Sequence, residues 1–242
     1  MSGLEGKKAL VTGAAGGIGQ AIVQALQNEG VTVTGSDMVE CKADHSLPGD
    51  LTDPEFCETL AITASEIMGS LDIVVNNAGI ITRGSITEAS DEDLRKTLAI
   101  NVEAPFRLCR SAIPLMAEAG GGAIVNTASC WGVHPGPNHP VYVMSKAAIA
   151  SLTQCLGMDH AHQNIRVNAV CPNEVNTPMI RTGFATRGLD PDKAIDELNA
   201  SVPLGRIAEP EDIADVVVFL ASEKARYLCG TLIEVNGGKP VQ

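Results

Sequence analysis

Short apolar runs alternate along the chain with longer segments of helical periodicity, and this alternation most limits the possible folds. Short apolar runs bounded by turn residues are typical of buried strands. The predicted strands are Lys8–Thr12, Val31–Ser36, Leu71–Asn76, Ala123–Thr127, Ile165–Val170 and Leu232–Val235. The predicted helices are Ile18–Asn28, Pro54–Met68, Asp91–Ala119, Val141–His162 and Pro210–Ser222. The pattern predicts an α/β fold, a doubly wound parallel sheet with helices on both faces.

Two segments interrupt this alternation. Met38–Gly49 is too short and too polar for a full crossover helix. Thr177–Val202 has mixed polarity and lies where we expect a lid over the substrate. No repeat, low-complexity tract or linker divides residues 1–242, so the sequence predicts a single domain.

Composition excludes several classes of partner. Lys and Arg number 17 against 29 Asp and Glu, and the resulting net charge of −12 repels nucleic acid and anionic membranes. No run of about 18 apolar residues is present, and the N-terminus has no signal-peptide profile. The seven cysteines include no Cys-x-x-Cys pair, which disfavours a metal cluster and a secreted disulfide framework. We therefore expect a cytoplasmic protein that binds no metal, nucleic acid or membrane.

A glycine-rich turn, Thr12-Gly13-Ala14-Ala15-Gly16-Gly17-Ile18-Gly19, follows the first predicted strand. Its glycines allow backbone N–H groups to approach a pyrophosphate, and the N-terminus of the next helix adds a partial positive charge. Turns of this kind also occur for purely geometric reasons. Because this one joins the first strand to the first helix, we interpret it as a dinucleotide site.

Asp37 ends the second predicted strand. A carboxylate there can accept hydrogen bonds from the adenosine ribose hydroxyls and would repel a 2′-phosphate. No Arg or Lys lies among Ala14, Ala15 and Gly16 to reverse this preference. Asp37 therefore predicts NAD rather than NADP, although taken alone it could be an ordinary turn residue.

Tyr142 and Lys146 stand four positions apart, so a phenol and an ammonium share one helix face. Lys146 can lower the pKa of Tyr142 and let the phenol act as a base near neutral pH. Ser129 follows the strand Ala123–Thr127, at the edge where open α/β sheets build their sites. By itself the Tyr-x-x-x-Lys spacing also describes an ordinary helix face.

Together these motifs resemble the classical short-chain dehydrogenase/reductase family, over essentially the whole chain. The matching segments, in family order, are Thr12–Gly19, Asn76–Gly79, Asn101, Ser129, Tyr142-x-x-x-Lys146 and Pro172…Thr177-Pro178. The resemblance implies a Rossmann-like fold and hydride transfer between a secondary alcohol and a ketone. The lid resembles that of a subgroup with cytosolic (R)-3-hydroxybutyrate dehydrogenase and dehydrogenases of 2-keto-3-deoxy sugar acids.

The resemblance also implies a role for each matched residue. Tyr142 is the general acid and base, and Ser129 hydrogen-bonds the reacting oxygen. Lys146 tunes Tyr142 and binds the nicotinamide ribose, and Asn101 holds a water that passes the proton onward. The implied cofactor residues are Gly13, Ala15, Gly16, Gly17, Ile18, Gly19, Asp37, Asp50, Leu51, Asn77, Ala78, Gly79, Tyr142, Lys146, Val175 and Thr177.

Asn173 departs from the family, which usually has Gly after the proline that Pro172 matches. Asn tolerates positive φ better than other non-glycine residues, so either the backbone is kept or the side chain reaches the nicotinamide or substrate. Few aromatic side chains flank the catalytic residues, which favours a small polar substrate over a flat steroid. The expected substrate contacts are Ser129, Trp131, His134, His139, Tyr142, Asn173 and Arg187.

Two arginines match positions in that subgroup. Arg187 corresponds to a lid arginine that contacts a substrate carboxylate, and a guanidinium fork suits a carboxylate. The alternative for Arg187 is a solvated lid charge. For Arg206 we expect a structural ion pair.

The predicted function is NAD-dependent interconversion of a secondary alcohol and a ketone on a sugar acid, polyol or hydroxy acid. Two alternatives stay open. A 3-oxoacyl-type NADPH reductase is disfavoured by Asp37, and a non-catalytic NAD-binding sensor is disfavoured by the Ser129–Tyr142 pair. The family usually forms tetramers through its two long helices, so a homotetramer is expected.

Overall fold

A single seven-stranded parallel sheet forms the centre of the protein in a computed structural model that describes residues 2–239. Its strands follow the order β3-β2-β1-β4-β5-β6-β7, so the direction of winding reverses between β1 and β4. The strands are β1 (Lys8–Thr12), β2 (Thr32–Ser36), β3 (His45–Ser46), β4 (Ile73–Asn76), β5 (Gly122–Thr127), β6 (Ile165–Pro172) and β7 (Leu232–Val235). This confirms the predicted doubly wound α/β fold.

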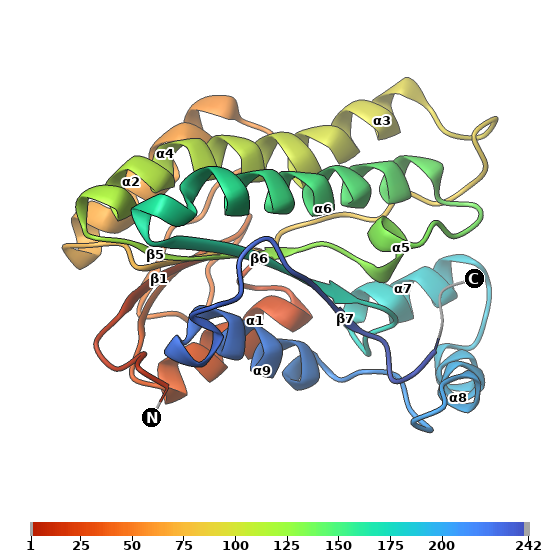
Figure 1. Ribbon diagram of the computed structural model, residues 1–242. Helices are drawn as coiled ribbons and strands as arrows, with labels where there is room; N and C mark the ends of the chain where they lie inside the picture. The colour runs from red at the N-terminus through yellow and green to blue at the C-terminus, as the bar shows by residue number, and fades with distance from the viewer. Residues whose placement is uncertain (1, 240–242) are drawn as a thin grey trace.

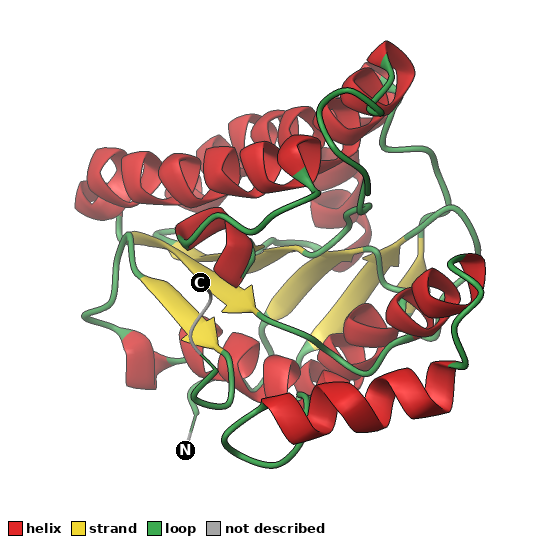
Figure 2. Ribbon diagram, turned by 90° about the vertical axis from the view of Figure 1, so that its right-hand side faces the viewer, coloured by secondary structure: helices red, strands yellow, loops and turns green. Residues whose placement is uncertain are grey.

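Helices cover both faces of the sheet (Figure 1). One layer contains α1 (Gly17–Asn28) and α9 (Pro210–Ala221), and the other contains α2 (Pro54–Met68), α4 (Ala104–Glu118) and α6 (Pro140–His160). Figure 2 shows the sheet between these two layers. Adjacent residues of β1 point to opposite layers, since Val11 packs with α1 and α9 whereas Leu10 packs with α2 and α4. Burial on both faces explains why the strands are continuous apolar runs.

The predicted helix Asp91–Ala119 is not continuous. It consists of α3 (Asp91–Leu98), a π-helical turn at Ala99–Glu103, and α4. Ser90 caps α3 in a capping box with Asp93. The π turn inserts an extra residue into the helix, which a hydrophobic period of 3.6 does not reveal.

Two short elements were missed by the sequence analysis. Segment Met38–Gly49 contains β3, which adds an edge strand beside β2, and the Asp44 carboxylate accepts the N–H of Val33 at 2.8 Å to hold it there. The second is α5 (Cys130–Val133), directly after Ser129. Elements of two and four residues are too short to carry a recognisable period.

The segment expected to be a lid contains two helices, α7 (Pro178–Thr186) and α8 (Pro191–Ser201), which follow β6 and lie on the right in Figure 1. α8 begins at Pro191, and the Asp190 carboxylate caps it by accepting the N–H of Asp192 at 3.0 Å. Phe184 and Ile195 pack together between the two helices. The segment is therefore an ordered unit with its own small apolar core.

No helix within residues 2–239 has the length and apolar character needed to cross a membrane. Over the same residues, no three side chains among His, Cys, Asp and Glu are grouped so that they could hold a metal ion.

Gly19 lies where α1 begins under the glycine-rich turn, and a methyl group there would overlap the carbonyl of Gly13 and stand 2.9 Å from the Cα of Ala14. We predict that Gly19→Ala lowers the free energy of unfolding by about 1–3 kcal/mol, as overpacking does elsewhere. Urea denaturation followed by circular dichroism measures this change. Gly16→Ala is the matched control, since its Cβ would meet the Gly13 carbonyl oxygen at 3.3 Å. An equal loss in both variants would contradict the close-packing argument.

Candidate active site

The glycine-rich turn after β1 packs against the turn after β4, between the two strands where the sheet reverses its winding. Gly13 has φ of +65°, in the left-handed region that favours glycine. The Asn77 amide donates to the carbonyls of Thr12 and Gly13 at 3.1 and 3.2 Å. The turns after β1 and β4 are thus joined at the position where open α/β sheets bind ligands.

Asp37 faces this turn from the end of β2. Its Oδ2 accepts the N–H of Ala15 at 2.9 Å, and its Oδ1 accepts the N–H of Met38 at 2.7 Å. The side chain is only partly buried, so each carboxylate oxygen keeps a lone pair for a further donor. A negative charge therefore lies beside the glycine-rich turn.

Three more predicted cofactor residues belong to the segments that follow β4 and precede α2. Leu51 and Ala78 line one small hollow together with Thr12. Asp50 lies directly before Leu51 in the sequence, and its Oδ1 accepts the N–H of Thr52 at 2.8 Å. The hollow therefore joins the turns that follow β1 and β4 to the segment before α2.

Thr177 lies against the first turn of α1. A Cβ at Gly17 would come within 3.1 Å of the Thr177 methyl group. Ile18 packs into the core beneath α1. Val175 is buried and bridges Ala208, which fixes the loop that leads from β6 to α7.

Two of the predicted catalytic side chains, Lys146 and Asn101, meet around Gly79, and Tyr142 lies near Lys146. Lys146 Nζ donates to the carbonyl of Thr127 at 2.7 Å and lies 6.0 Å from the centre of the Tyr142 ring. A Cβ at Gly79 would lie 3.2 Å from Lys146 Nζ and 3.4 Å from Asn101 Oδ1. Glycine at this position thus lets the ammonium and the Asn101 amide lie close to one strand end.

Asn101 is held by a set of reciprocal hydrogen bonds. Its Oδ1 accepts the N–H of Ile80 and its Nδ2 donates to the carbonyl of the same residue, both at 2.9 Å. The second Nδ2 proton goes to Ser145 Oγ at 3.0 Å, and that hydroxyl donates to the carbonyl of Tyr142 at 2.7 Å. Ser145 is a functional neighbour that the sequence analysis missed, although it stands directly before Lys146.

The pKa values of the catalytic pair shift in opposite directions. Burial raises the pKa of Tyr142, while a hydrogen bond from Ser129 and the charge of Arg83 lower it. Burial lowers the pKa of Lys146 to about 8. Lys146 is not among the groups that lower the pKa of Tyr142, so its expected effect on the phenol stays a prediction. At neutral pH the phenol is protonated, the form required of a general acid.

Cys130 directly follows Ser129, and both residues are buried. Its Sγ donates to the carbonyl of Cys171 at 3.0 Å. Burial raises the pKa of both thiols to about 12. These cysteines thus act as small apolar side chains behind the site.

Three of the predicted substrate residues, Trp131, His139 and Tyr142, form one aromatic wall. Trp131 lies 4.6 Å from His139 and 6.4 Å from Tyr142, measured between ring centres. His139 Nδ1 donates to the carbonyl of Pro137 at 2.9 Å, which leaves Nε2 as an acceptor. His134 turns instead toward β7, where its Nε2 is 3.2 Å from Glu234 Oε1.

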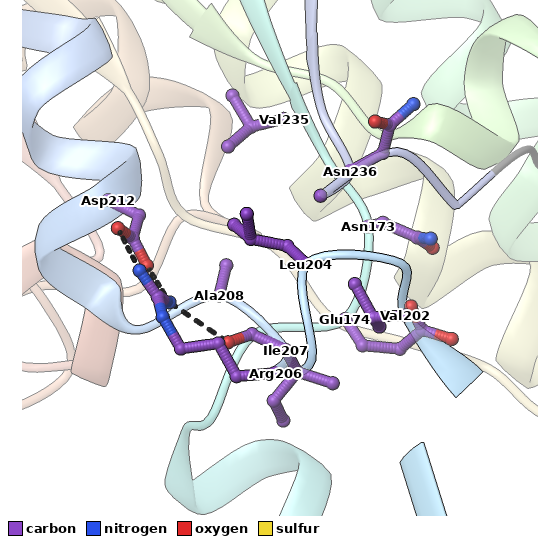
Figure 3. A pocket seen from close by; sticks show the side chains of 11 residues that line it. Asn173, Glu174, Val202, Leu204, Arg206, Ile207, Ala208, Asp212, Val235 and Asn236 are labelled. Carbon is purple, nitrogen blue, oxygen red and sulfur yellow. Dashed lines mark hydrogen bonds and ion pairs between the residues drawn. The ribbon is translucent and has the colours of Figure 1, made fainter. Parts of the chain in front are cut away.

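Asn173 lies on a cavity shown in Figure 3. Its N–H donates to the carbonyl of Val235 at 3.1 Å, and among residues 2–239 it is not one of the non-glycine residues with positive φ. The chain therefore accommodates Asn173 without the left-handed backbone considered from the sequence. Arg206 borders the same cavity and pairs with Asp212 at 2.9 Å, as expected.

Arg187 lies at the end of α7. Its Nε donates to the carbonyl of Gly183 at 3.0 Å, and its guanidinium lies 4.9 Å from the centre of the Phe184 ring. The side chain is exposed and makes no ion pair with another described residue.

Comparison with known proteins agrees with this geometry. The family profile described as enoyl-(acyl carrier protein) reductase matches residues 13–239. The ligand-free structure of Thermoplasma acidophilum aldohexose dehydrogenase superimposes with a TM-score of 0.94 at 32% identity, covering 99% of this chain and 96% of that chain. The 3α-hydroxysteroid dehydrogenase of Mediterraneibacter gnavus is 36% identical over 97% of each chain. The trans-4-hydroxycyclohexanecarboxylate dehydrogenase of Sinomonas cyclohexanicum is 34% identical over 96% of this chain and 92% of its own.

The chain belongs to the short-chain dehydrogenase/reductase family. The fold of this family binds a nicotinamide cofactor, either NAD or NADP. The residues present fit such a group, since Gly13 and Gly19 leave a cradle that side chains would fill. Lys146 adds a buried ammonium whose three N–H groups exceed the one acceptor, Thr127, found among the described residues.

In this short-chain dehydrogenase/reductase, the lowered pKa of Lys146 makes the free energy of unfolding depend on pH. Between about pH 8 and pH 10.5, the ordinary pKa of lysine, Lys146 keeps its proton in the unfolded chain but has lost it in the folded chain. Stability contributed at this position therefore rises as the pH increases through that window. We predict that the free energy of unfolding of the wild type, relative to Lys146→Met, increases by up to a few kcal/mol between pH 8 and pH 10.5. Urea denaturation across this range measures it, and a pH-independent difference would contradict the shift.

Proposed function

We propose that this short-chain dehydrogenase/reductase uses NAD to interconvert a secondary alcohol and a ketone on a small polar substrate. The supporting observation is the Tyr142 side chain, whose ring centre lies 6.0 Å from Lys146 Nζ and whose pKa Ser129 lowers. A dinucleotide can be bound without a positioned serine–tyrosine pair. The geometry thus favours an enzyme over a redox sensor.

When bound, the nicotinamide cofactor supplies the hydride acceptor or donor. In the reduction direction, Tyr142 gives its proton to the carbonyl oxygen while Ser129 hydrogen-bonds that oxygen. In oxidation, Tyr142 accepts the hydroxyl proton. Lys146 would donate to the nicotinamide ribose, and Asn101 would continue the proton path toward solvent.

Asp37 supports NAD as the cofactor. Its carboxylate lies 2.9 Å from the backbone nitrogen of Ala15, on the turn that would meet the pyrophosphate. A 2′-phosphate would add negative charge beside it, whereas ribose hydroxyls would donate to its free lone pairs.

The proposed substrate class is a sugar acid, polyol or hydroxy acid under a lid at 177–202. Trp131 and His139 offer a small polar-edged wall rather than a broad apolar surface. The names aldohexose dehydrogenase and trans-4-hydroxycyclohexanecarboxylate dehydrogenase fit a small hydroxylated ring. Because one relative is a 3α-hydroxysteroid dehydrogenase, a substrate panel should compare these small polar alcohols with a hydroxysteroid.

A 3-oxoacyl-type NADPH reductase is the second candidate, favoured by the acyl-carrier-protein description of the family profile. The charge of Asp37 opposes it. NADPH-dependent reduction of a 3-oxoacyl thioester that exceeds all NAD-linked alcohol oxidation would replace our first proposal.

We also infer a homotetramer located in the cytoplasm. All seven cysteines are free, which suits a reducing compartment. The apolar side chains of Phe106 on α4 and Met158 on α6 are 49% and 74% exposed, and a partner subunit could cover them. Light scattering tests the tetramer.

We predict that Tyr142→Phe lowers kcat for the best NAD-linked alcohol at least about a hundredfold, the scale of general acid–base catalysis. The affinity for NADH, followed by fluorescence, should change less than about threefold, because the phenol is one contact among many. Turnover preserved in Tyr142→Phe would exclude the proposed mechanism.

We predict that Asp37→Ala lowers the ratio of kcat/KM with NAD to kcat/KM with NADP at least about tenfold, equivalent to about 1.4 kcal/mol. Initial rates with both cofactors at one alcohol concentration measure the ratio. Asp44→Ala serves as the control, since Asp44 also caps a backbone N–H near β2 but faces away toward Gln27. An unchanged ratio in Asp37→Ala would remove the argument for NAD.

A further inference from the structure

Ser145 lies on α6, directly before Lys146 and three residues after Tyr142, and its side chain is fully buried. Its hydroxyl donates to the carbonyl of Tyr142 at 2.7 Å. A serine hydroxyl has one proton, so once that proton is given to a carbonyl the oxygen can only accept. It accepts from Nδ2 of Asn101 at 3.0 Å. Ser145 therefore joins the helix of the catalytic pair to the amide of Asn101.

Asn101 comes from a different element, the π turn at Ala99–Glu103, which packs beside α6. Its buried side chain is already bonded to the loop after β4, because Oδ1 accepts the N–H of Ile80 and Nδ2 donates to the carbonyl of Ile80, both at 2.9 Å. This pair of bonds uses one of the two Nδ2 protons. Ser145 accepts the other proton and so completes the hydrogen bonding of the amide nitrogen.

The amide and the catalytic lysine meet beside Gly79. A Cβ at Gly79 would lie 3.2 Å from Lys146 Nζ and 3.4 Å from Asn101 Oδ1, so both polar atoms border the same point in the loop after β4. The ammonium is held there by the Thr127 carbonyl at 2.7 Å. Ser145 is adjacent to one of these two groups along α6 and hydrogen-bonded to the other, and thus it links them.

We propose that Ser145 is a positioning residue for the reaction and that it acts through Asn101. This inference rests on the proposed function, in which Tyr142 exchanges a proton with the substrate and Asn101 continues the proton path. Without the Ser145 hydroxyl, one Nδ2 proton of a buried amide loses its acceptor, which is costly. The amide then shifts toward another partner, and its Oδ1 leaves the position beside Lys146. A displacement of about 1 Å is enough to slow a reaction about a hundredfold.

α6 carries a second hydroxyl with the same two kinds of hydrogen bond, and it provides a matched control. Thr153 Oγ1 donates to the carbonyl of Ile149 at 2.8 Å and accepts from Nδ2 of Asn126 at 2.9 Å. Thr153 is also fully buried. It lies about two helical turns beyond the catalytic pair. Removing this hydroxyl therefore has the same structural cost at a distance from Tyr142 and Lys146.

The test compares Ser145→Ala with Thr153→Val, each of which removes one hydroxyl. Both variants should lose about 2–10 °C in melting temperature, since each leaves a buried amide N–H unpaired. Ser145→Ala should also lower kcat for the best NAD-linked alcohol about 10- to 100-fold, with KM and the affinity for NADH changed less than about threefold. Equal kcat values in the two variants, or a loss confined to KM, would overturn the inference.

Ser145→Thr keeps a hydroxyl at this position and should hold kcat within about threefold of the wild type, because threonine makes the same bond to a preceding helix carbonyl. A folded Ser145→Thr variant as slow as Ser145→Ala would contradict a role for the hydroxyl. The rescue separates the lost hydrogen bond from a general loss of stability.

A double-mutant cycle with Asn101→Ala tests whether Ser145 acts through the amide, and it is decisive even if Ser145→Thr fails to fold. In the background of Asn101→Ala, the further change Ser145→Ala should lower kcat less than about twofold, since the group it positions is already gone. Losses that multiply would show that Ser145 acts instead through the Tyr142 backbone, and would overturn the assignment.

Tyr142→Phe, measured in the same assay, separates this inference from the proposed function. Turnover that depends on Tyr142 but is equal in Ser145→Ala and Thr153→Val rejects the positioning role and keeps the proposed function. Turnover that survives in Tyr142→Phe, or the absence of NAD-linked turnover in the wild type, rejects the proposed function together with the inference that rests on it.

Discussion

The contact between the turns after β1 and β4 is the constraint on which the site depends. Asn77 donates to two consecutive carbonyls of the glycine-rich turn, and Gly13 meets Ala78 with no room for a side chain. These bonds hold the sheet together at its reversal of winding and leave the N-terminus of α1 open. The predicted cofactor residues are placed around this junction.

The catalytic group is built outward from the same edge. Lys146 is anchored at the end of β5 through Thr127, and Asn101 is anchored to the loop after β4 through Ile80. Burial lowers the pKa of Lys146 and raises the pKa of Tyr142. Ser129 and the charge of Arg83 lower the pKa of Tyr142 and so favour the phenolate.

The sequence predicted those parts of the site whose partners are close along the chain. Tyr142 and Lys146 share one helix, and the glycines of the first turn belong to one loop, so their spacing is enough. Asn101 lies in a π turn and bonds to Ile80, which is distant in sequence, and periodicity alone could not reveal either feature. Arg83 was missed for the same reason, because its neighbours Tyr142 and Gly183 come from two other segments.

The buried thiols beside the catalytic serine determine how the protein responds to alkylating reagents. With a pKa of about 12, Cys130 and Cys171 have almost no thiolate at neutral pH, and thiolate is the nucleophile. Cys155 and Cys229 are exposed on the surface. Maleimide dyes therefore attach at exposed thiols such as Cys229 and report on the protein without entering its reaction centre.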